Sequence, residues 1–223
     1  IDVIRDVIAR QRAPRIALAG RTDVPLGPLL KTVIGTDLNG DTDIKEQLGR
    51  GRWYPYETTG NGAVELLDAR VDSAEKVPLK AVRRQRPDVI LLPWTYEEPA
   101  DDTEPTDVGA VDRLLDEARR GMTPGEASPS VMVLLQPDRL PSGVTLGRAE
   151  RVVRQQLLGS GIPGSAITVA EMTHPADCAR QLQQRLPPQA RLQFSRITPV
   201  SESRRRIAQT LIRASAGITG TIT

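Results

Sequence analysis

The side chains that most often perform covalent or metal chemistry are scarce in this sequence. Its 223 residues include one histidine, His174, and one cysteine, Cys178. One residue of each type excludes multi-histidine zinc sites, cysteine-ligated clusters and internal disulfides. The two lie four residues apart, but nothing in the sequence suggests an orienting third group or an oxyanion site for a cysteine–histidine catalytic pair. We expect a helix start here, with Thr173 as its cap and Pro175 in the first helical position.

The composition is that of a globular chain. Hydrophobic residues make up 39% and charged residues 26%, which excludes a disordered polymer. No run approaches the roughly 18 apolar residues of a membrane-spanning helix. The net charge of +2 gives no argument for nucleic acid, and basic residues are not interleaved with aromatics. The chain opens at Ile1 without methionine or a signal-peptide pattern, as expected of a processed or trimmed chain.

Short apolar runs alternate with helical patterns along the chain. The predicted strands are 15–19, 52–57, 63–68, 88–93, 131–135 and 166–169. The predicted helices are 1–12, 28–34, 106–120, 145–160, 175–186 and 201–216. The later strands are continuous apolar segments, typical of parallel strands covered on both faces, and the alternation predicts a doubly wound α/β sheet. Because Pro55 cannot donate to a ladder, we expect 52–57 to be an edge strand.

The residues after the first predicted strand read GRTDVPLGPLLKTVIG over 20–35. They resemble, without a gap, the phosphate-binding loop of bacterial Era-like and septin-like GTPases, whose consensus is GRTGVGKSSLINALLG. The matching positions are Gly20, Arg21, Thr22, Val24, Leu29 and Gly35. The resemblance implies a Ras-like α/β fold, with a mostly parallel six-stranded sheet and helices on both faces.

The chemistry of that loop is missing. Leu26 stands where the family has the lysine that reaches the β- and γ-phosphates, and Gly27 stands where it has the hydroxyl that holds magnesium. Pro25 and Asp23 replace glycines, removing one donor N–H and adding a negative charge beside the phosphates. Losing two charged hydrogen bonds, with this repulsion, weakens nucleotide binding by about three or more orders of magnitude. Hydrolysis by the family route is therefore excluded on this interpretation.

The later motifs of the family occur in order and are altered. The DxxG segment becomes Asp68-Ala69-Arg70-Val71, and the guanine-reading NKxD becomes residues 135–138, of which only Asp138 is kept. Val169-Ala170 keeps one residue of the Ser-Ala motif. We therefore interpret the chain as a pseudo-GTPase, a GTPase-like domain with a degenerate Walker A loop. Its predicted vestigial pocket comprises Gly20, Arg21, Thr22, Asp23, Pro25, Leu26, Gly27, Asp68 and Asp138.

The C-terminal third resembles GTPases that continue into a hydrophobic, membrane-associated region. Leu186, Pro187, Arg191 and Phe194 match that pattern, and the basic helix that follows carries Arg204–Arg206. This resemblance implies proximity to an anionic membrane through the C-terminus. The expected organisation is an N-terminal helix over 1–14, a GTPase-like domain over 15–200 and a basic helix and tail over 201–223.

Aromatic residues gather near the predicted edge strand and after a central strand. They are Trp53, Tyr54, Tyr56, Trp94 and Tyr96. One interpretation is packing along the edge strand and over the strand end; the other is a surface for a protein partner, since edge strands pair and aromatics anchor interfaces.

The leading hypothesis is a bacterial, catalytically inactive module that acts through protein–protein contacts, with an intact GTPase or a second copy as partner. No cofactor, metal or nucleic acid is expected, and the expected location is cytoplasmic or at the cytoplasmic face of the membrane. The alternative is a divergent switch that binds GTP or GDP without magnesium through Asp138 and the helix after Gly27. An unrelated enzyme on the same fold ranks last.

Overall fold

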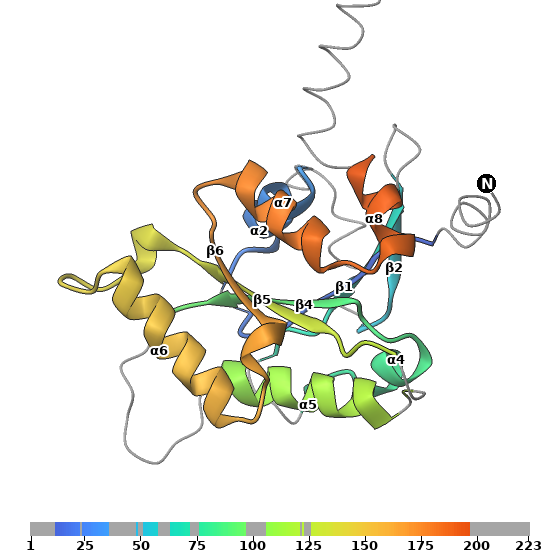
Figure 1. Cartoon of the computed structure of the whole chain (residues 1–223), viewed down its shortest axis with the longest axis horizontal. Helices are drawn as coiled ribbons and strands as arrows, with labels where there is room; N and C mark the ends of the chain where they lie inside the picture. Colours follow the sequence, from blue (N-terminus) through green and yellow to red (C-terminus); the bar gives the residue numbers. More distant parts are fainter. Residues whose placement is uncertain are drawn as a thin grey trace, which may run out of the picture.

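The chain folds into a central sheet between two layers of helices (Figure 1), as seen in a computed structural model. The structure describes residues 12–22, 24–35, 48, 51–57, 63–71, 76–96, 106–120, 122 and 126–196. The predicted helices over 1–12 and 201–216, and with them the outer boundaries of the predicted domains, lie outside the described residues.

Six strands form one sheet in the order β2-β3-β1-β4-β5-β6. Their bounds are β1 (Arg15–Leu18), β2 (Tyr54–Glu57), β3 (Ala63–Asp68), β4 (Val89–Trp94), β5 (Ser130–Leu135) and β6 (Ile167–Glu171). All neighbours run parallel except β2 and β3, which are antiparallel. The predicted mostly parallel six-stranded sheet is confirmed, and β2 is an edge strand as Pro55 indicated.

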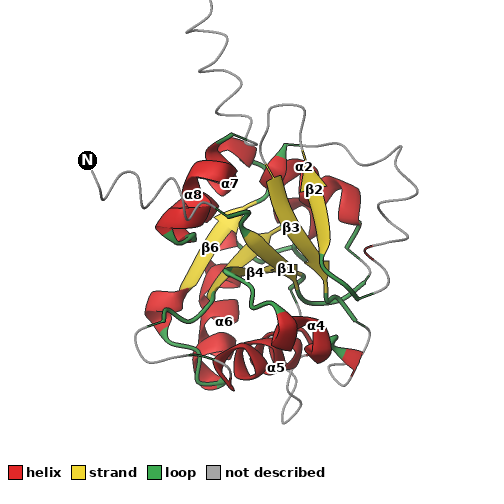
Figure 2. Cartoon of the chain, turned by 90° about the vertical axis from the view of Figure 1, so that its right-hand side faces the viewer, coloured by secondary structure: helices red, strands yellow, loops and turns green. Residues whose placement is uncertain are grey.

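The helices cover both faces of the sheet (Figures 1 and 2). One layer holds α2 (Leu26–Ile34), α7 (Pro175–Arg185) and α8 (Pro188–Ser195). The other holds α4 (Leu79–Arg84), α5 (Thr106–Arg120) and α6 (Leu146–Gly159). Two short 3₁₀ turns, η2 (Pro137–Arg139) and η3 (Gly164–Ala166), precede α6 and β6 respectively.

Alternation along the strands divides the core into two apolar clusters. In β1, Ile16 and Leu18 pack toward α2 and α7, whereas Ala17 packs toward α5, because successive side chains of a strand point to opposite faces. All six residues of β4 are buried, which explains why that strand reads as a continuous apolar run. Phe194 of α8 is fully buried in the cluster that contains Ile16 and Leu18.

The structure differs from the predicted elements in a few places. Helix α2 begins at Leu26, two residues before Pro28, because proline is tolerated in the first helical turn. The sequence analysis missed α4 and α8, which are short. Residues 186–187 separate α7 from α8, and Leu186 is extended at φ −70° and ψ 146° because a proline follows it.

No helix among the described residues has the length and apolar character needed to cross a membrane.

An ion-pair cluster joins α4 to α5. The Glu117 side chain is 2% exposed, and its carboxylate accepts a hydrogen bond from Nε of Arg83 at 2.5 Å and one from Nη1 of Arg120 at 3.2 Å. The Arg83 bond lowers the pKa of Glu117, although burial acts in the opposite direction. Because the folded-state pKa lies below the unfolded one, the stabilisation is complete above the ordinary glutamate range and is lost as pH falls through the lowered pKa.

We expect Glu117→Gln to lower the melting temperature at neutral pH. The difference from wild type should shrink as pH falls below the ordinary glutamate range and through the lowered pKa, where the wild-type carboxylate also becomes protonated. Thermal unfolding followed by circular dichroism measures both. Asp116→Asn is the control, since Asp116 is on the same helix, is 55% exposed and meets Arg119 only at 3.8 Å. A pH-independent deficit for Glu117→Gln would contradict this account.

Candidate functional site

The loop between β1 and α2 turns at Gly20. Gly20 has φ +98°, and a Cβ there would lie 3.1 Å from Cδ1 of Leu92 and 3.4 Å from the carbonyl oxygen of Pro93. Glycine is therefore required by both conformation and space. Arg21 and Thr22 are exposed, and Asp23 lies outside the described residues.

The start of α2 is poorly equipped to bind an anion. Pro25 is the N-cap and makes no side-chain capping hydrogen bond, and Pro28 lies in the first turn. Both lack the backbone N–H with which helix N-termini hold phosphates. Leu26 stands where the resembled family has a lysine, and it packs against the apolar cluster beneath α2. Gly27 is buried. The sequence predicted the lost N–H at Pro25 and the lost lysine at position 26, but not the second lost N–H at Pro28.

A side chain from the end of β3 binds to this loop. Arg70 donates from Nε and Nη2 to the two carboxylate oxygens of Asp68, at 2.8 and 2.7 Å. Its remaining terminal nitrogen, Nη1, donates to the carbonyl oxygen of Val24, within the loop itself. The Arg70 and Asp68 side chains are only 7% and 13% exposed. The Arg70 guanidinium therefore lies between the Asp68 carboxylate and the loop after β1.

The backbone around Arg70 aims it at the loop. The N–H of Ala69 donates to the carbonyl of Leu18, and the N–H of Val71 donates to that of Gly20, both at 2.8 Å. These bonds continue the β1–β3 pairing past the end of the strands. Val71, at the position of the family's glycine, is thus held against the start of the loop. In P-loop NTPases an aspartate here binds Mg²⁺; here the carboxylate binds a guanidinium.

The residues predicted to lie near a base are found after the end of β5 and near the end of β6. Asp138 is exposed on η2, after the end of β5, and Gln136 is buried. Ala170, near the end of β6, is buried and lines a small cavity of about 220 Å³. Three carboxylates line the same cavity: Glu150, Glu171 and Asp177. Their charge opposes an anionic ligand, and no cluster of metal-ligating residues occurs in the described ranges.

The topology places the predicted pocket residues along one edge of the sheet. Parallel strands end at a common edge, so Gly20, Asp68 and Asp138 follow β1, β3 and β5 at the same side. The cavities of about 590 Å³ and about 220 Å³ are lined by residues other than 20–28 and Asp68. Arg70 is the site residue that the sequence analysis missed. The signal was available: a retained aspartate, no lysine in the loop, and an arginine two positions later.

The five aromatics do not form one surface. Trp94 and Tyr96 are buried and meet edge to face, with ring centroids 5.7 Å apart. Their burial favours the packing interpretation for these two residues. Trp53 is half-buried, and its indole N–H donates to the carbonyl of Ala81 at 3.0 Å. Tyr54 and Tyr56 on β2 remain partly exposed, so a partner surface there rests on these two.

The histidine and cysteine lie at the start of α7. The N-cap is His174 rather than Thr173, and Pro175 occupies the first helical position as predicted. The Cys178 thiol donates to the carbonyl of Glu171 at 2.9 Å, whereas the His174 ring meets the Thr173 hydroxyl at 3.0 Å. Burial raises the pKa of Cys178 to about 11. The pair therefore lacks an activated nucleophile.

Sheet order, the loop after β1 and the position of Asp68 together give the chain a GTPase-like fold. Among solved structures, the chain is similar to the bacterial selenocysteine-specific elongation factor EF-Sec, at 14% identity and a TM-score of 0.49, covering 79% of this chain and 30% of that one. It is also similar to the cytosolic domain of the T. maritima FeoB iron transporter in its GMPPNP form, at 12% identity and a TM-score of 0.39, covering 78% of this chain and 64% of that one. The chain thus spans less than two thirds of either structure. No family model and no curated protein matches the sequence.

The Arg70–Asp68 pair is expected to stabilise the fold. Removing one partner leaves the other charge buried, so Arg70→Ala should lower the free energy of unfolding by about 3 kcal/mol. Urea unfolding of Arg70→Ala, Asp68→Ala and the double variant forms a cycle whose coupling should exceed about 1 kcal/mol. Arg139→Ala, at an exposed arginine of the same sheet edge, should change stability by less than about 0.5 kcal/mol. Additive losses in the cycle would show that the two side chains do not depend on each other.

Cys178 is expected to resist thiol reagents in the folded protein. A pKa of about 11 in place of 9.0 reduces the thiolate fraction at neutral to mildly alkaline pH by roughly a hundredfold, and the side chain is also buried. Reaction with Ellman's reagent should therefore be negligible in native buffer and stoichiometric in guanidinium chloride. Rapid stoichiometric reaction of the native protein would refute this assignment.

Proposed function

We propose that this chain is a pseudo-GTPase module that neither hydrolyses GTP nor requires a nucleotide, and that acts through contacts with another protein. The observation that carries the proposal is the Arg70 guanidinium held between Asp68 and the Val24 carbonyl. A bound nucleotide with magnesium needs Asp68 for the metal and needs the loop to present N–H groups. Here Asp68 is occupied, and one loop carbonyl accepts from Arg70.

The start of α2 supports the same conclusion. Pro25 and Pro28 remove donors, and Leu26 packs into the core, where a charged lysine would be costly to bury. The missing N–H donors and the missing lysine both weaken phosphate binding, and both agree with a loop that binds the Arg70 guanidinium instead. A phosphate at this position would have to displace the guanidinium from a bidentate pair with a mostly buried carboxylate.

We assign such a module a role in contact with a protein partner, and the partly exposed tyrosines of the edge strand β2 are the surface we propose for it. Among the described strands, β2 pairs with β3 alone. Pro55 has no backbone N–H to donate, so β2 is a weaker template for an added strand. Tyr54 and Tyr56, both partly exposed, are then the anchors, and the partner is an intact GTPase or a second copy.

Calorimetric titration with GTP, GDP and ATP, each with and without Mg²⁺, tests the proposal. We expect no nucleotide binding at the phosphate loop at about millimolar concentration. Asp138→Ala is titrated in parallel, because a divergent switch would use that carboxylate. Micromolar binding that Asp138→Ala abolishes would overturn the pseudo-GTPase proposal and favour a switch that does not need magnesium.

The partner surface is tested separately by sedimentation of wild type and Tyr54→Ala/Tyr56→Ala, alone and mixed with a candidate intact GTPase. We expect a complex or a dimer for wild type that the double variant loses. Arg139→Ala is the control, because Arg139 lies on η2 after β5, away from β2 in the sheet order. A wild-type chain that stays monomeric alone and binds no candidate GTPase would argue against this surface.

A further inference from the structure

A second concave feature lies at the end of the sheet where the parallel strands begin, opposite the loop after β1. A cavity of about 590 Å³ opens there, within the range of pockets that hold metabolite-sized ligands. Its walls come from the residues before β1, β4 and β5 and from the junction between α7 and α8. The GTPase motifs do not include any of these segments.

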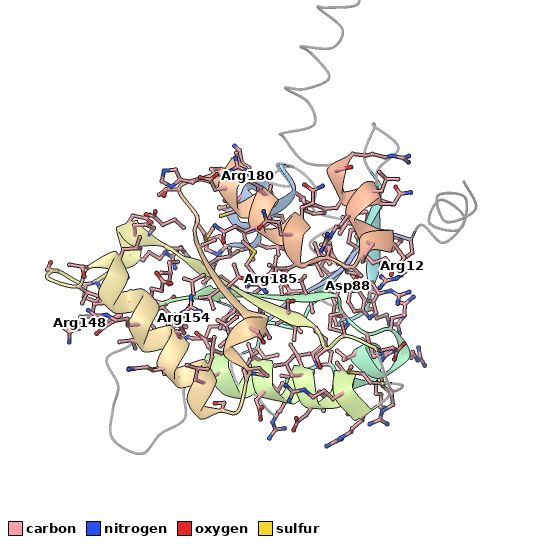
Figure 3. All side chains as sticks on the ribbon, in the orientation of Figure 1. Arg12, Asp88, Arg148, Arg154, Arg180 and Arg185 are labelled. Carbon is pink, nitrogen blue, oxygen red and sulfur yellow. The ribbon has the colours of Figure 1, made fainter. Side chains whose placement is uncertain are left out.

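The cavity is strongly basic. Its lining arginines are Arg12, Arg15, Arg86, Arg185 and Arg191. Two carboxylates, Asp88 and Glu126, are the acidic side chains of the lining. The arginines come from separate parts of the sequence, so no single charge run reveals the cluster before folding. Figure 3 shows Arg12 beside Asp88, and Arg185 on α7.

Three of these arginines are neutralised by carboxylates. Arg12 binds Asp88 through two hydrogen bonds, at 2.8 and 2.5 Å, and Arg86 binds Glu126 through two, at 2.6 and 2.9 Å. Arg15 binds Glu65 at 2.7 Å. The Asp88 and Glu126 bonds raise the pKa values of Arg12 and Arg86. Both acidic groups of the lining are thus already engaged.

The other two arginines donate to main-chain carbonyls instead. Arg185 donates to Ser165 at 2.7 Å. Arg191 donates to Leu186 at 2.7 Å and to Gln184 at 2.9 Å. A carbonyl orients a guanidinium without cancelling its charge, and within the described residues neither arginine forms an ion pair. The cavity therefore carries two oriented, uncompensated positive charges with donors to spare.

Most of the remaining lining is apolar, and Ser128, Ser130 and Gln189 are its uncharged polar residues. Four prolines line it, together with Met122, Ala127 and Leu186. Prolines restrict the backbone of the lining, so little ordering is needed when a ligand enters. We propose that this cavity binds an organic phosphomonoester, whose dianionic group matches Arg185 and Arg191 and whose body packs against the prolines. Bidentate guanidinium–phosphate geometry favours this class over monocarboxylates.

Phenyl phosphate is a suitable probe, and calorimetry on the full chain gives its dissociation constant. We expect binding at about millimolar or tighter for wild type. In Arg185→Gln/Arg191→Gln it should weaken at least about tenfold, the loss of roughly one charge-assisted hydrogen bond. Arg180→Gln is the matched control: Arg180 lies on the same helix and pairs with Asp177 at 3.1 Å, and it is not among the cavity residues.

Two further arms make the result decisive. Circular dichroism checks that the variants are folded, and Arg185→Gln alone leaves the Arg191 bonds at the α7–α8 junction intact. Benzoate and inorganic phosphate separate the roles of charge and apolar body. Weaker binding in both cavity variants with unchanged binding in Arg180→Gln supports the site. No binding of phenyl phosphate by wild type up to about 10 mM, or equal binding by all variants, overturns it.

This proposal and the proposed function fail in different ways. Nucleotides are phosphate compounds, so weak heat in a GTP titration can arise at either end of the sheet. Heat abolished by Arg185→Gln/Arg191→Gln belongs to the basic cavity and leaves the pseudo-GTPase proposal standing. Heat that Asp138→Ala abolishes and the cavity variants leave unchanged comes from binding near the loop after β1, and it counts against the pseudo-GTPase proposal.

Discussion

A mostly buried carboxylate needs a positive charge beside it. The contacts of Asp68 with the loop between β1 and α2 follow from that requirement. The register of β3 against β1 places Asp68 opposite Leu18, directly beneath the loop. In a metal-dependent site the counter-charge arrives with the nucleotide. Here it is covalently part of the chain, since Arg70 reaches back to the residue two positions before it. The Val24 carbonyl then faces a donor rather than a phosphate, so the loop is satisfied without a ligand.

The loop keeps its shape for reasons that have nothing to do with phosphate. Gly20 is held against Leu92 and Pro93 of β4, where no side chain fits. Leu29 and Leu30 anchor α2 in one of the two apolar clusters. These contacts fix where the chain turns and where the helix begins. The shape of the turn is therefore determined by packing and does not require a bound ligand.

The sequence predicted the features that depend on local pattern. Continuous apolar runs identified the strands, and Pro55 identified the edge, because periodicity and donor count act within a few residues. The sequence did not predict α8, whose sequence PQARLQFS has little amphipathic pattern and whose position depends on burial of Phe194. For Trp94 and Tyr96 the sequence left both packing and an interface open, since only the surrounding helices decide whether an aromatic is covered.

The sites that matter most were the hardest to predict, for a physical reason. Arg70 and Asp68 are close in sequence, yet the third partner, Val24, lies 46 residues away. The five arginines of the basic cavity come from four segments that only the sheet brings together. Folding therefore separates the charges: carboxylates line the small cavity near the strand ends, and uncompensated guanidiniums line the large one at the strand starts. Because electrostatic attraction acts on the folded arrangement, the charges favour an anion at the basic cavity over one at the small cavity beside the strand ends.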